Sequence, residues 1–148
     1  MSRFVRPQTT VLPLTQGDSI TVKTRLSAGE QHEAYARMYL AGVDGKLHAN
    51  PLQSGRALMT AYLVDWNLKD DDGALVPIRG LTIAELESVL GSLDPESFAE
   101  IKTAIQTHEA SQAAAREAEK KSRDGSPGAD PISRSPSVSA GELIGSVN

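Results

Sequence analysis

Two helix starts in close succession, within the stretch LTIAELESVLGSLDPESFAEI of residues 81–101, constrain the fold of this chain more than any other feature. In the first start, the Thr82 hydroxyl can accept a hydrogen bond from the amide three residues later, and the Glu85 carboxylate can reach back to the Thr82 amide. Leu81 and Leu86 have the spacing of a hydrophobic staple around this capping box. The pattern predicts a helix that begins directly after Thr82.

The second start is equally well marked. Asp94 is an N-cap residue, Pro95 fits the first helical position, and Phe98 can staple onto the leucine before the cap. Ile101 and Ile105 continue the apolar face at helical spacing, whereas the following THEASQAAAREAEKKSR has only alanines as apolar groups. We therefore predict a helix that is buried along its first part and exposed beyond it.

The N-terminal segment alternates apolar and polar residues, as strands do. TVLPL precedes the turn signal TQGD, and SITVKTRL follows it with Ile20, Val22 and Leu26 on one face. Because Pro13 has no amide donor, we expect the first strand to lie at a sheet edge or to be short. The pattern predicts a β-hairpin whose apolar face packs on the rest of the chain.

Two further helices are expected between the hairpin and the acidic segment that follows Trp66. The first has the capping-box spacing of Ser27 and Glu30 and is expected to end near Gly42. The second begins with Asn50 as its cap, followed directly by a proline. The inward faces are expected to contain Ala34, Tyr35, Met38 and Tyr39 in the first helix and Leu52, Leu58, Met59, Tyr62, Leu63 and Trp66 in the second.

These elements predict a mainly α fold with a small N-terminal β-hairpin, which is an α+β domain. An N-terminal arm and hairpin, residues 1–26, are expected to pack on a compact helical core domain, residues 27–108, which continues as an exposed helix over residues 109–121. Residues 122–148 are rich in Ser, Pro and Gly and offer too little apolar surface to offset backbone entropy, so we predict a disordered tail or linker. Its last apolar side chains, which could dock on a partner, are Leu143, Ile144 and Val147.

The composition is that of an intracellular protein without affinity for nucleic acid or membranes. A charged fraction of 23% and a formal net charge of -4 provide no basic field for phosphates. The chain has no cysteine, which excludes disulfides, thiolate metal sites and thiol nucleophiles. It also has no run of about 18 apolar residues that could span a bilayer, and prolines and threonines interrupt the apolar core that a signal peptide would need.

The stretch DWNLKDDDGALVP, residues 65–77, has the acidic composition of a metal loop but not its spacing. A calcium loop counted from Asp65 needs an oxygen ligand at its fifth position and glycine at its sixth, and these positions hold Lys69 and Asp70. We therefore predict a solvated turn that Trp66 anchors in the core.

The histidines do not form a metal motif either. His32 and His108 both begin the pattern of a zincin helix, but Ala36 and Gln112 stand where the second histidine is required. We predict that both are solvated helical residues and that His48 is a loop residue without an orienting partner. With no G-x-S-x-G elbow and no phosphate-binding loop, the sequence predicts no catalytic, cofactor-binding or metal-binding residue and no enzymatic activity.

Four aromatic residues are candidates for partner binding. Core packing is the first interpretation for an aromatic residue on a helix, but one that is left at the surface is a natural interface anchor. The four residues are Tyr35, Tyr39, Tyr62 and Trp66.

In its order of features, the chain resembles the tail assembly chaperones of long-tailed, siphovirus-type bacteriophages. The resemblance rests on LPLTQGDSITVKTRLSAGEQ, on VDWNLKDDDGALVPI and on LTIAELESVLGSLDPESFAEI. It covers residues 12–105 and consists of packing and turn signatures without a catalytic motif. The resemblance implies a small, mostly helical phage protein of the host cytoplasm that is absent from the mature virion.

The resemblance also implies the partners. Such a protein would bind the tape-measure protein and keep it soluble until the tail tube polymerises, with the major tail tube protein as a second partner. In that family a ribosomal frameshift often produces a longer form of the same chain, which is a third candidate partner, and the predicted linker suits such an extension. Because a tape measure is a long amphipathic helical chain, we expect a binding groove between the helices that contain AYARMYL and ALMTAYLVDW.

Two other classes of function remain open at this point. One is a structural component of the virion, such as a minor tail or head-tail joining protein. The other is an enzyme whose site is assembled from residues distant in the sequence, which would require a deep pocket with converging Asp, His or Arg side chains.

Overall fold

The computed structural model describes residues 2–125 of this 148-residue chain. The chain divides into two units at Ala110, and every strand of residues 2–125 lies in the first unit. Its helices and small antiparallel sheets confirm the α+β class. Among the helices of the described residues, none combines the length and apolarity that a bilayer crossing requires.

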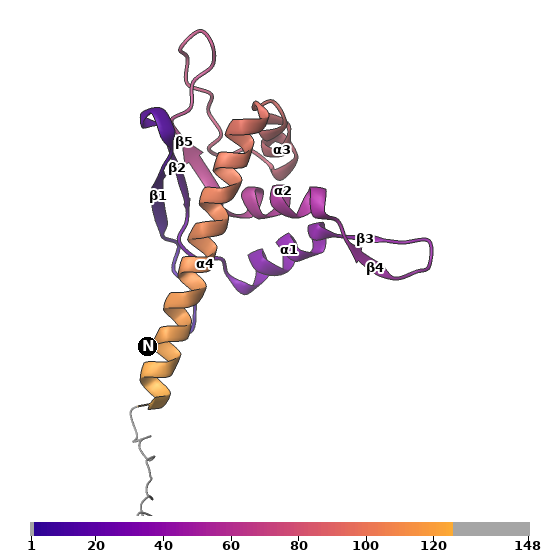
Figure 1. Ribbon diagram of the computed structural model, residues 1–148, viewed down its shortest axis with the longest axis vertical. Helices are drawn as coiled ribbons and strands as arrows, with labels where there is room; N and C mark the ends of the chain where they lie inside the picture. Colours follow the sequence, from indigo (N-terminus) through magenta and orange to yellow (C-terminus); the bar gives the residue numbers. More distant parts are fainter. Residues whose placement is uncertain (1, 126–148) are drawn as a thin grey trace, which may run out of the picture. The chain divides into compact units, whose positions relative to one another are not determined.

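The larger sheet has three antiparallel strands in the order β1-β2-β5. Strand β1, Thr9–Pro13, pairs with β2, Ser19–Lys23, across the short 3-10 turn η1, Thr15–Gly17 (Figure 1). The predicted hairpin is therefore confirmed, and Pro13 lies in an edge strand, where a missing amide donor is tolerated.

The third strand corrects the prediction for the second helix. Helix α2, Pro51–Tyr62, begins with the predicted Asn50 cap, but it stops at Tyr62, and strand β5, Leu63–Trp66, follows at once. Strand β5 pairs antiparallel with β2, and Trp66 lies opposite Ile20. The predicted extension of the helix to Trp66 is wrong because the open edge of β2 gives these backbone groups ladder partners.

The end of the first helix also differs from the prediction. Helix α1, Ala28–Met38, begins with the predicted capping box of Ser27, but it ends four residues before Gly42. Strands β3, Tyr39–Ala41, and β4, Leu47–Ala49, then form a second antiparallel hairpin, which was not predicted. We call residues 39–49 the apolar arm.

The two well-marked helix starts are confirmed. Helix α3, Ile83–Gly91, has the Thr82 capping box, and α4, Pro95–Gly125, starts where the Asp94 carboxylate accepts a bond of 2.9 Å from the Ser97 amide. Helix α4 continues to Gly125, four residues beyond the predicted end of the exposed helix at residue 121. The rest of the predicted tail, with its candidate docking side chains, lies outside the described residues.

The core of the first unit joins the sheet to three helices. Its buried side chains come from β2, β5, α2, α3, the segment before α3 and the first part of α4. Leu52 does not belong to it, because its side chain is 89% exposed. The cluster consists of Ile20, Val22, Leu58, Met59, Tyr62, Leu63, Trp66, Ile78, Leu86, Leu90, Ile101 and Ile105.

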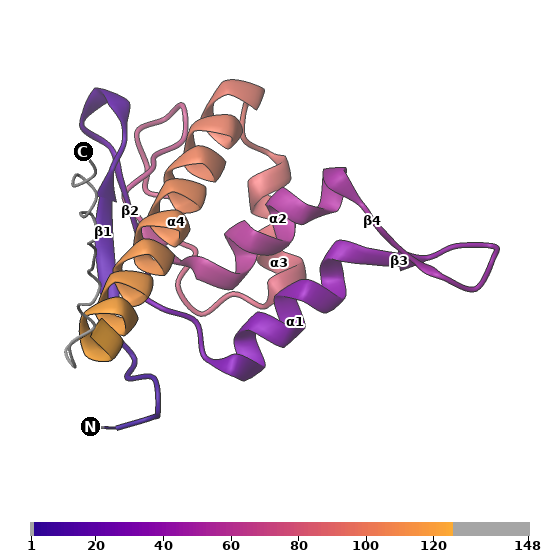
Figure 2. The same ribbon diagram turned by 60° about the horizontal axis from the view of Figure 1, so that its bottom comes forward.

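Figures 1 and 2 show that the apolar arm projects away from the helices of this unit. Helices α1 and α2, which lie on either side of it in the chain, pack against each other. The arm therefore has a firm base, and within residues 2–125 no layer of protein covers its faces.

Candidate functional site

The apolar arm is joined to its two helices without a linker. Tyr39 takes up extended backbone directly after Met38, and the Asn50 amide donates a 2.8 Å bond to the Met38 carbonyl, which closes the base of the arm. At the tip, Gly45 has φ of 77°, a left-handed conformation that favours glycine, and the Asp44 carboxylate accepts a 3.0 Å bond from the Lys46 amide. These contacts hold the arm in a defined conformation.

One face of the arm is entirely apolar. The register pairs Tyr39 with Ala49 and Ala41 with Leu47, and directly paired residues of antiparallel strands point to the same side. All four residues are exposed, with exposed fractions of 46% for Tyr39 and 73% for Leu47. The arm thus presents to solvent the kind of surface that strands normally bury.

The arm and its flanks account for most of the exposed apolar surface. Of the ten large hydrophobic side chains that are exposed in the described part of the chain, six lie between residues 35 and 52. A patch of this kind, unlike scattered single residues, marks an interaction site. The six are Tyr35, Tyr39, Leu40, Val43, Leu47 and Leu52.

The structure separates the four candidate aromatic residues into two pairs. Tyr35 and Tyr39 are about half exposed, at 48% and 46%, so the expectation that they belong to a buried stripe is wrong. Tyr62 and Trp66 are buried in the core. Tyr62 donates a hydrogen bond of 3.3 Å to the Glu109 carboxylate. Only the first pair is therefore placed to touch a partner without unfolding of the domain.

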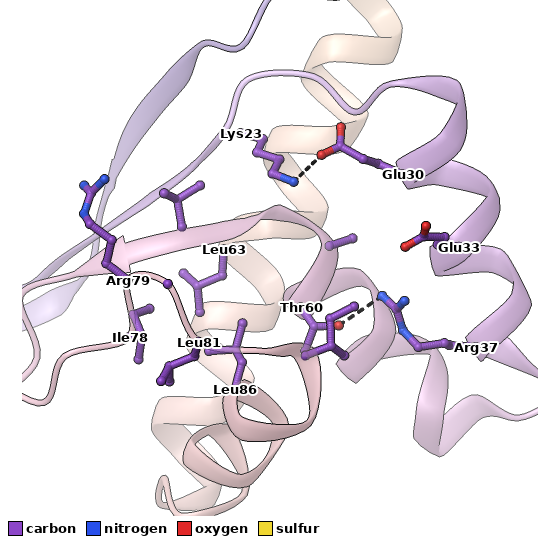
Figure 3. Close-up of a pocket in the computed structure, with 14 residues that line it drawn as sticks. Lys23, Glu30, Glu33, Arg37, Thr60, Leu63, Ile78, Arg79, Leu81 and Leu86 are labelled. Carbon is purple, nitrogen blue, oxygen red and sulfur yellow. Dashed lines mark hydrogen bonds and ion pairs between the residues drawn. The ribbon is translucent and has the colours of Figure 1, made fainter.

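A pocket of about 300 Å³ lies close to the predicted groove, beside α1 and the end of α2 (Figure 3). Apolar side chains such as Leu63, Ile78 and Leu86 line one part of it, and charged side chains from β2, α1 and the segment before α3 line another. None of the four candidate aromatic residues lines this pocket. The residues that contribute charge are Lys23, Glu30, Glu33, Arg37 and Arg79.

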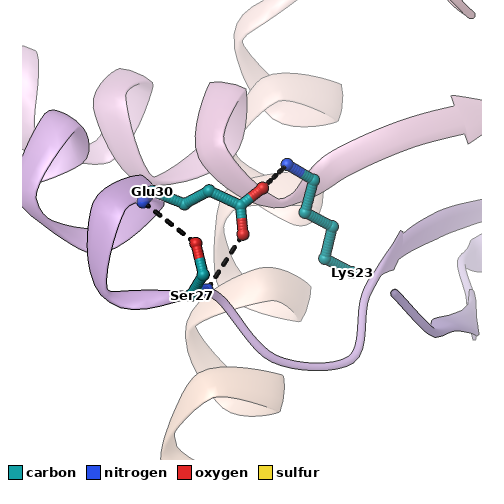
Figure 4. A network of polar contacts seen from close by, with 3 residues as sticks. All are labelled: Lys23, Ser27 and Glu30. Atoms are coloured by element: carbon teal, nitrogen blue, oxygen red, sulfur yellow. Dashed lines mark hydrogen bonds and ion pairs between the residues drawn. The ribbon is translucent and has the colours of Figure 1, made fainter. Parts of the chain in front are cut away.

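Glu30 is held in place by β2 and by its own helix start. Its carboxylate pairs with the Lys23 ammonium and accepts a bond of 2.9 Å from the Ser27 amide (Figure 4). Burial alone would raise the pKa of Glu30, but the hydrogen bonds from Lys23 and Ser27 and the Lys23 charge outweigh burial and lower this pKa. A general acid needs the opposite shift, so the pair has the properties of a structural link between sheet and helix.

Arg37 and Glu33 extend from α1 toward the same pocket (Figure 3). The Arg37 guanidinium donates a long bond of 3.3 Å to the Thr60 hydroxyl, and its Nε is buried without a partner. These two side chains can present charge and hydrogen-bond donors to a bound group. They do not form the pair of nucleophile and contacting base that covalent catalysis requires.

The aspartate-rich stretch forms the predicted turn. The Asp70 carboxylate accepts bonds of 2.9 Å from the Asp72 and Ala74 amides, and Gly73 has the left-handed φ of 79° that such a turn requires. Trp66 anchors it, because the indole Nε1 donates a 2.7 Å bond to the carbonyl ten residues later. Within residues 2–125, no group of three or more acidic or histidine side chains is arranged to hold a metal ion.

Two of the three histidine predictions are wrong. His48 lies on β4 and its Nε2 is 3.1 Å from the Asp44 carboxylate, so it does have an orienting partner. His108 is buried, and its Nε2 lies 3.1 Å from the carbonyl oxygens of Lys23 and Thr24. Since both carbonyls only accept, Nε2 must carry the proton. His32 is exposed on α1, as predicted.

The sequence did contain a signal for the apolar arm. The dipeptide Asp44-Gly45, a strong hairpin signal, stands between the apolar run Tyr39–Ala41 and the run Leu47–Ala49, in which two of the three residues are apolar. The same residues also fit a helix end, because Gly42 and Gly45 tolerate the left-handed backbone that ends a helix.

Comparisons of the chain with protein-family models, with curated proteins and with solved structures found no match.

Proposed function

We propose that this protein is a tail assembly chaperone of a long-tailed bacteriophage. In this proposal it binds the tape-measure protein in the host cytoplasm, keeps it soluble while the tail tube assembles, and is absent from the finished virion. Tail tube subunits and a frameshifted longer form of the chain are further partners of the proposal. The apolar arm, residues 39–49, is the surface that would make the contact.

The observation that carries the proposal is the exposure of apolar side chains on the arm. An unassembled tape measure is expected to be an amphipathic helical chain that aggregates through its apolar stripe unless another surface covers the stripe. The arm presents Tyr39 and Leu47 on one face and Leu40 on the other, on a base braced by two packed helices. Such a surface can cover an apolar stripe without a chemical reaction and without a large rearrangement of the domain.

The expected strength of this contact suits a transient partner. Leu47 is 73% exposed, and burial of a leucine side chain contributes about 1.5 to 3 kcal/mol. Several such side chains must also offset the loss of translational and rotational freedom, so the complex is expected to be reversible. A chaperone that hands over its client needs that property.

The test is co-expression with the tape-measure protein encoded in the same genome. We expect the unaltered chain to keep the tape measure soluble and to co-purify with it, and a variant with both Tyr39→Ser and Leu47→Ser to lose both properties. The matched control is Leu75→Ser, because Leu75 is also exposed, at 54%, but lies in the aspartate-rich turn. Full co-purification of the double variant, with its fold intact by circular dichroism, would show that the arm is not the binding surface, and failure of the unaltered chain to keep the tape measure soluble would refute the chaperone function.

The alternative is a structural role in the virion, as a minor tail or head-tail joining protein. An apolar arm would serve a permanent contact as well as a transient one. Mass spectrometry of purified particles separates the two roles, because recovery of this chain in stoichiometric amounts would reject the chaperone function.

A further inference from the structure

A second pocket, of about 510 Å³, lies where the segment before β1 meets the end of β2, the start of α1 and strand β5. Its volume is within the range of ligand sites in proteins. No residue of the apolar arm lines it, so the proposed function does not use it. We call it the N-terminal pocket.

The N-terminal pocket is positively charged, in a chain whose formal net charge is -4. Three cationic side chains and one carboxylate line it, those of Arg6, Lys23, Arg25 and Glu30. The Glu30 carboxylate already binds the Lys23 ammonium and the Ser27 amide, one with each oxygen (Figure 4). Its charge is therefore balanced by Lys23, and the charge of the two arginines remains.

Arg6 and Arg25 are available to an anion from solvent. Both residues are exposed, and within residues 2–125 neither side chain makes an ion pair or a hydrogen bond. They belong to two segments that are joined by a 2.9 Å bond from the Thr24 amide to the Gln8 carbonyl. Because a guanidinium can donate two parallel hydrogen bonds to one carboxylate, the two arginines suit a ligand with carboxylates.

The rest of the wall favours a peptide over a nucleotide. Val5, Pro7 and Val64 provide apolar surface, but no aromatic side chain of the described residues lines the pocket, so a base would have nothing to stack on. Thr9 also lines the pocket and begins β1, whose only neighbour in the described sheet is β2. An extended segment that leaves the pocket along the open edge of β1 can gain backbone hydrogen bonds.

From the unpaired arginines, the apolar wall and the open strand edge, we infer that the N-terminal pocket binds a short peptide segment that carries carboxylates beside an apolar residue. The carboxylates pair with Arg6 and Arg25, and the apolar side chain packs on the wall. The inference goes beyond the proposed function, because it requires neither the apolar arm nor the tape-measure protein.

The experiment uses two fluorescent peptides of six residues, which are too short to form isolated helices. One has glutamates on both sides of a leucine, and the other has glutamines at the same positions, so the peptides differ in charge but hardly in shape. We expect the glutamate peptide to bind the full chain about tenfold more tightly at low salt, as measured by anisotropy, with a smaller difference at high salt. Equal binding of the two peptides at low salt would overturn the inference.

Variants of the chain assign the preference to the pocket. Arg6→Gln and Arg25→Gln should each weaken binding of the glutamate peptide about threefold, as the loss of one exposed charge pair would. The matched control is Arg3→Gln, because Arg3 is an exposed arginine of the same N-terminal segment that does not line the pocket. An equal loss in the control would show that binding depends on net charge alone and would overturn the assignment to this pocket.

Inorganic phosphate separates a peptide site from a general anion site. At equal ionic strength, phosphate should displace the labelled glutamate peptide far less effectively than unlabelled peptide does, because phosphate has no apolar group for the wall. Displacement by both at the same concentration would show that the pocket holds any anion, and the peptide inference would fall. The tape-measure protein takes no part in these measurements, so a failure of the chaperone function leaves their outcome unchanged.

Discussion

The substitution Trp66→Phe tests how the aspartate-rich turn is fixed to the fold. Trp66 is buried on β5, and its indole nitrogen donates a bond of 2.7 Å to the Val76 carbonyl. Phenylalanine keeps an aromatic ring in the core but removes the donor. The turn would then lose the contact that ties its far end to the sheet.

The expected loss of stability follows from two contributions. Leaving the half-buried Val76 carbonyl without its donor costs about 1 to 3 kcal/mol. The smaller ring leaves a gap in the core that costs about 1 kcal/mol more. We therefore expect the free energy of unfolding to fall by about 2 to 4 kcal/mol, which is a large share of the stability of an ordinary domain.

Urea denaturation followed by far-ultraviolet circular dichroism measures this loss. Fluorescence is unsuitable because Trp66 is the single tryptophan of the chain. The control Asp71→Ala alters an exposed residue of the same turn and should change the stability by less than about 0.5 kcal/mol. If Trp66→Phe costs no more than this control, the indole hydrogen bond does not anchor the turn and the reasoning is wrong.

Two further predictions concern stability. The pKa values of Glu30 and Asp65 are lowered in the folded state, Glu30 by the bonds from Lys23 and Ser27 against burial, and Asp65 chiefly by the bond from Arg79. Their contribution to stability should therefore be complete above their ordinary pKa values, near pH 4, and lost as the pH falls through the folded-state values. The urea concentration at the unfolding midpoint should decrease as the pH is lowered from 5 to 3, and it should decrease less steeply in Glu30→Gln. A midpoint of the unaltered chain that does not change over this pH range would contradict the prediction. Separately, His108→Phe keeps a ring but leaves two strand-end carbonyls without their donor, so it should cost about 1 to 3 kcal/mol in the same assay; an unchanged midpoint would show that water replaces the imidazole.

The sequence by itself determined the local features of this protein. The helix starts at Ser27, Thr82 and Asp94 were predictable because each cap is formed by side chains that lie within a few residues of the amides they satisfy. The N-terminal hairpin and the Asp70 turn were predictable for the same reason, since strand alternation and turn chemistry are short-range. Such features can be predicted without knowing how the other helices and strands of the chain are arranged.

The tertiary structure decided which apolar residues are buried and which remain at the surface. Residues 63–66 fit a helical face, yet they form β5 because β2 has an edge that needs a partner. His108 is buried where the last residue of β2, Lys23, and the residue after it, Thr24, offer two carbonyls to it, and those lie more than 80 residues away in the sequence.

The candidate site depended on the same kind of information. Tyr39 and Leu47 have the character of core residues and remain exposed, because the short arm turns away from the helices that would cover them. Apolar character is a property of the residue, whereas burial depends on the surfaces that the rest of the fold brings against it. That is why the sequence could name Tyr35 and Tyr39 as candidates beside Tyr62 and Trp66, but only the folded chain could separate the two pairs.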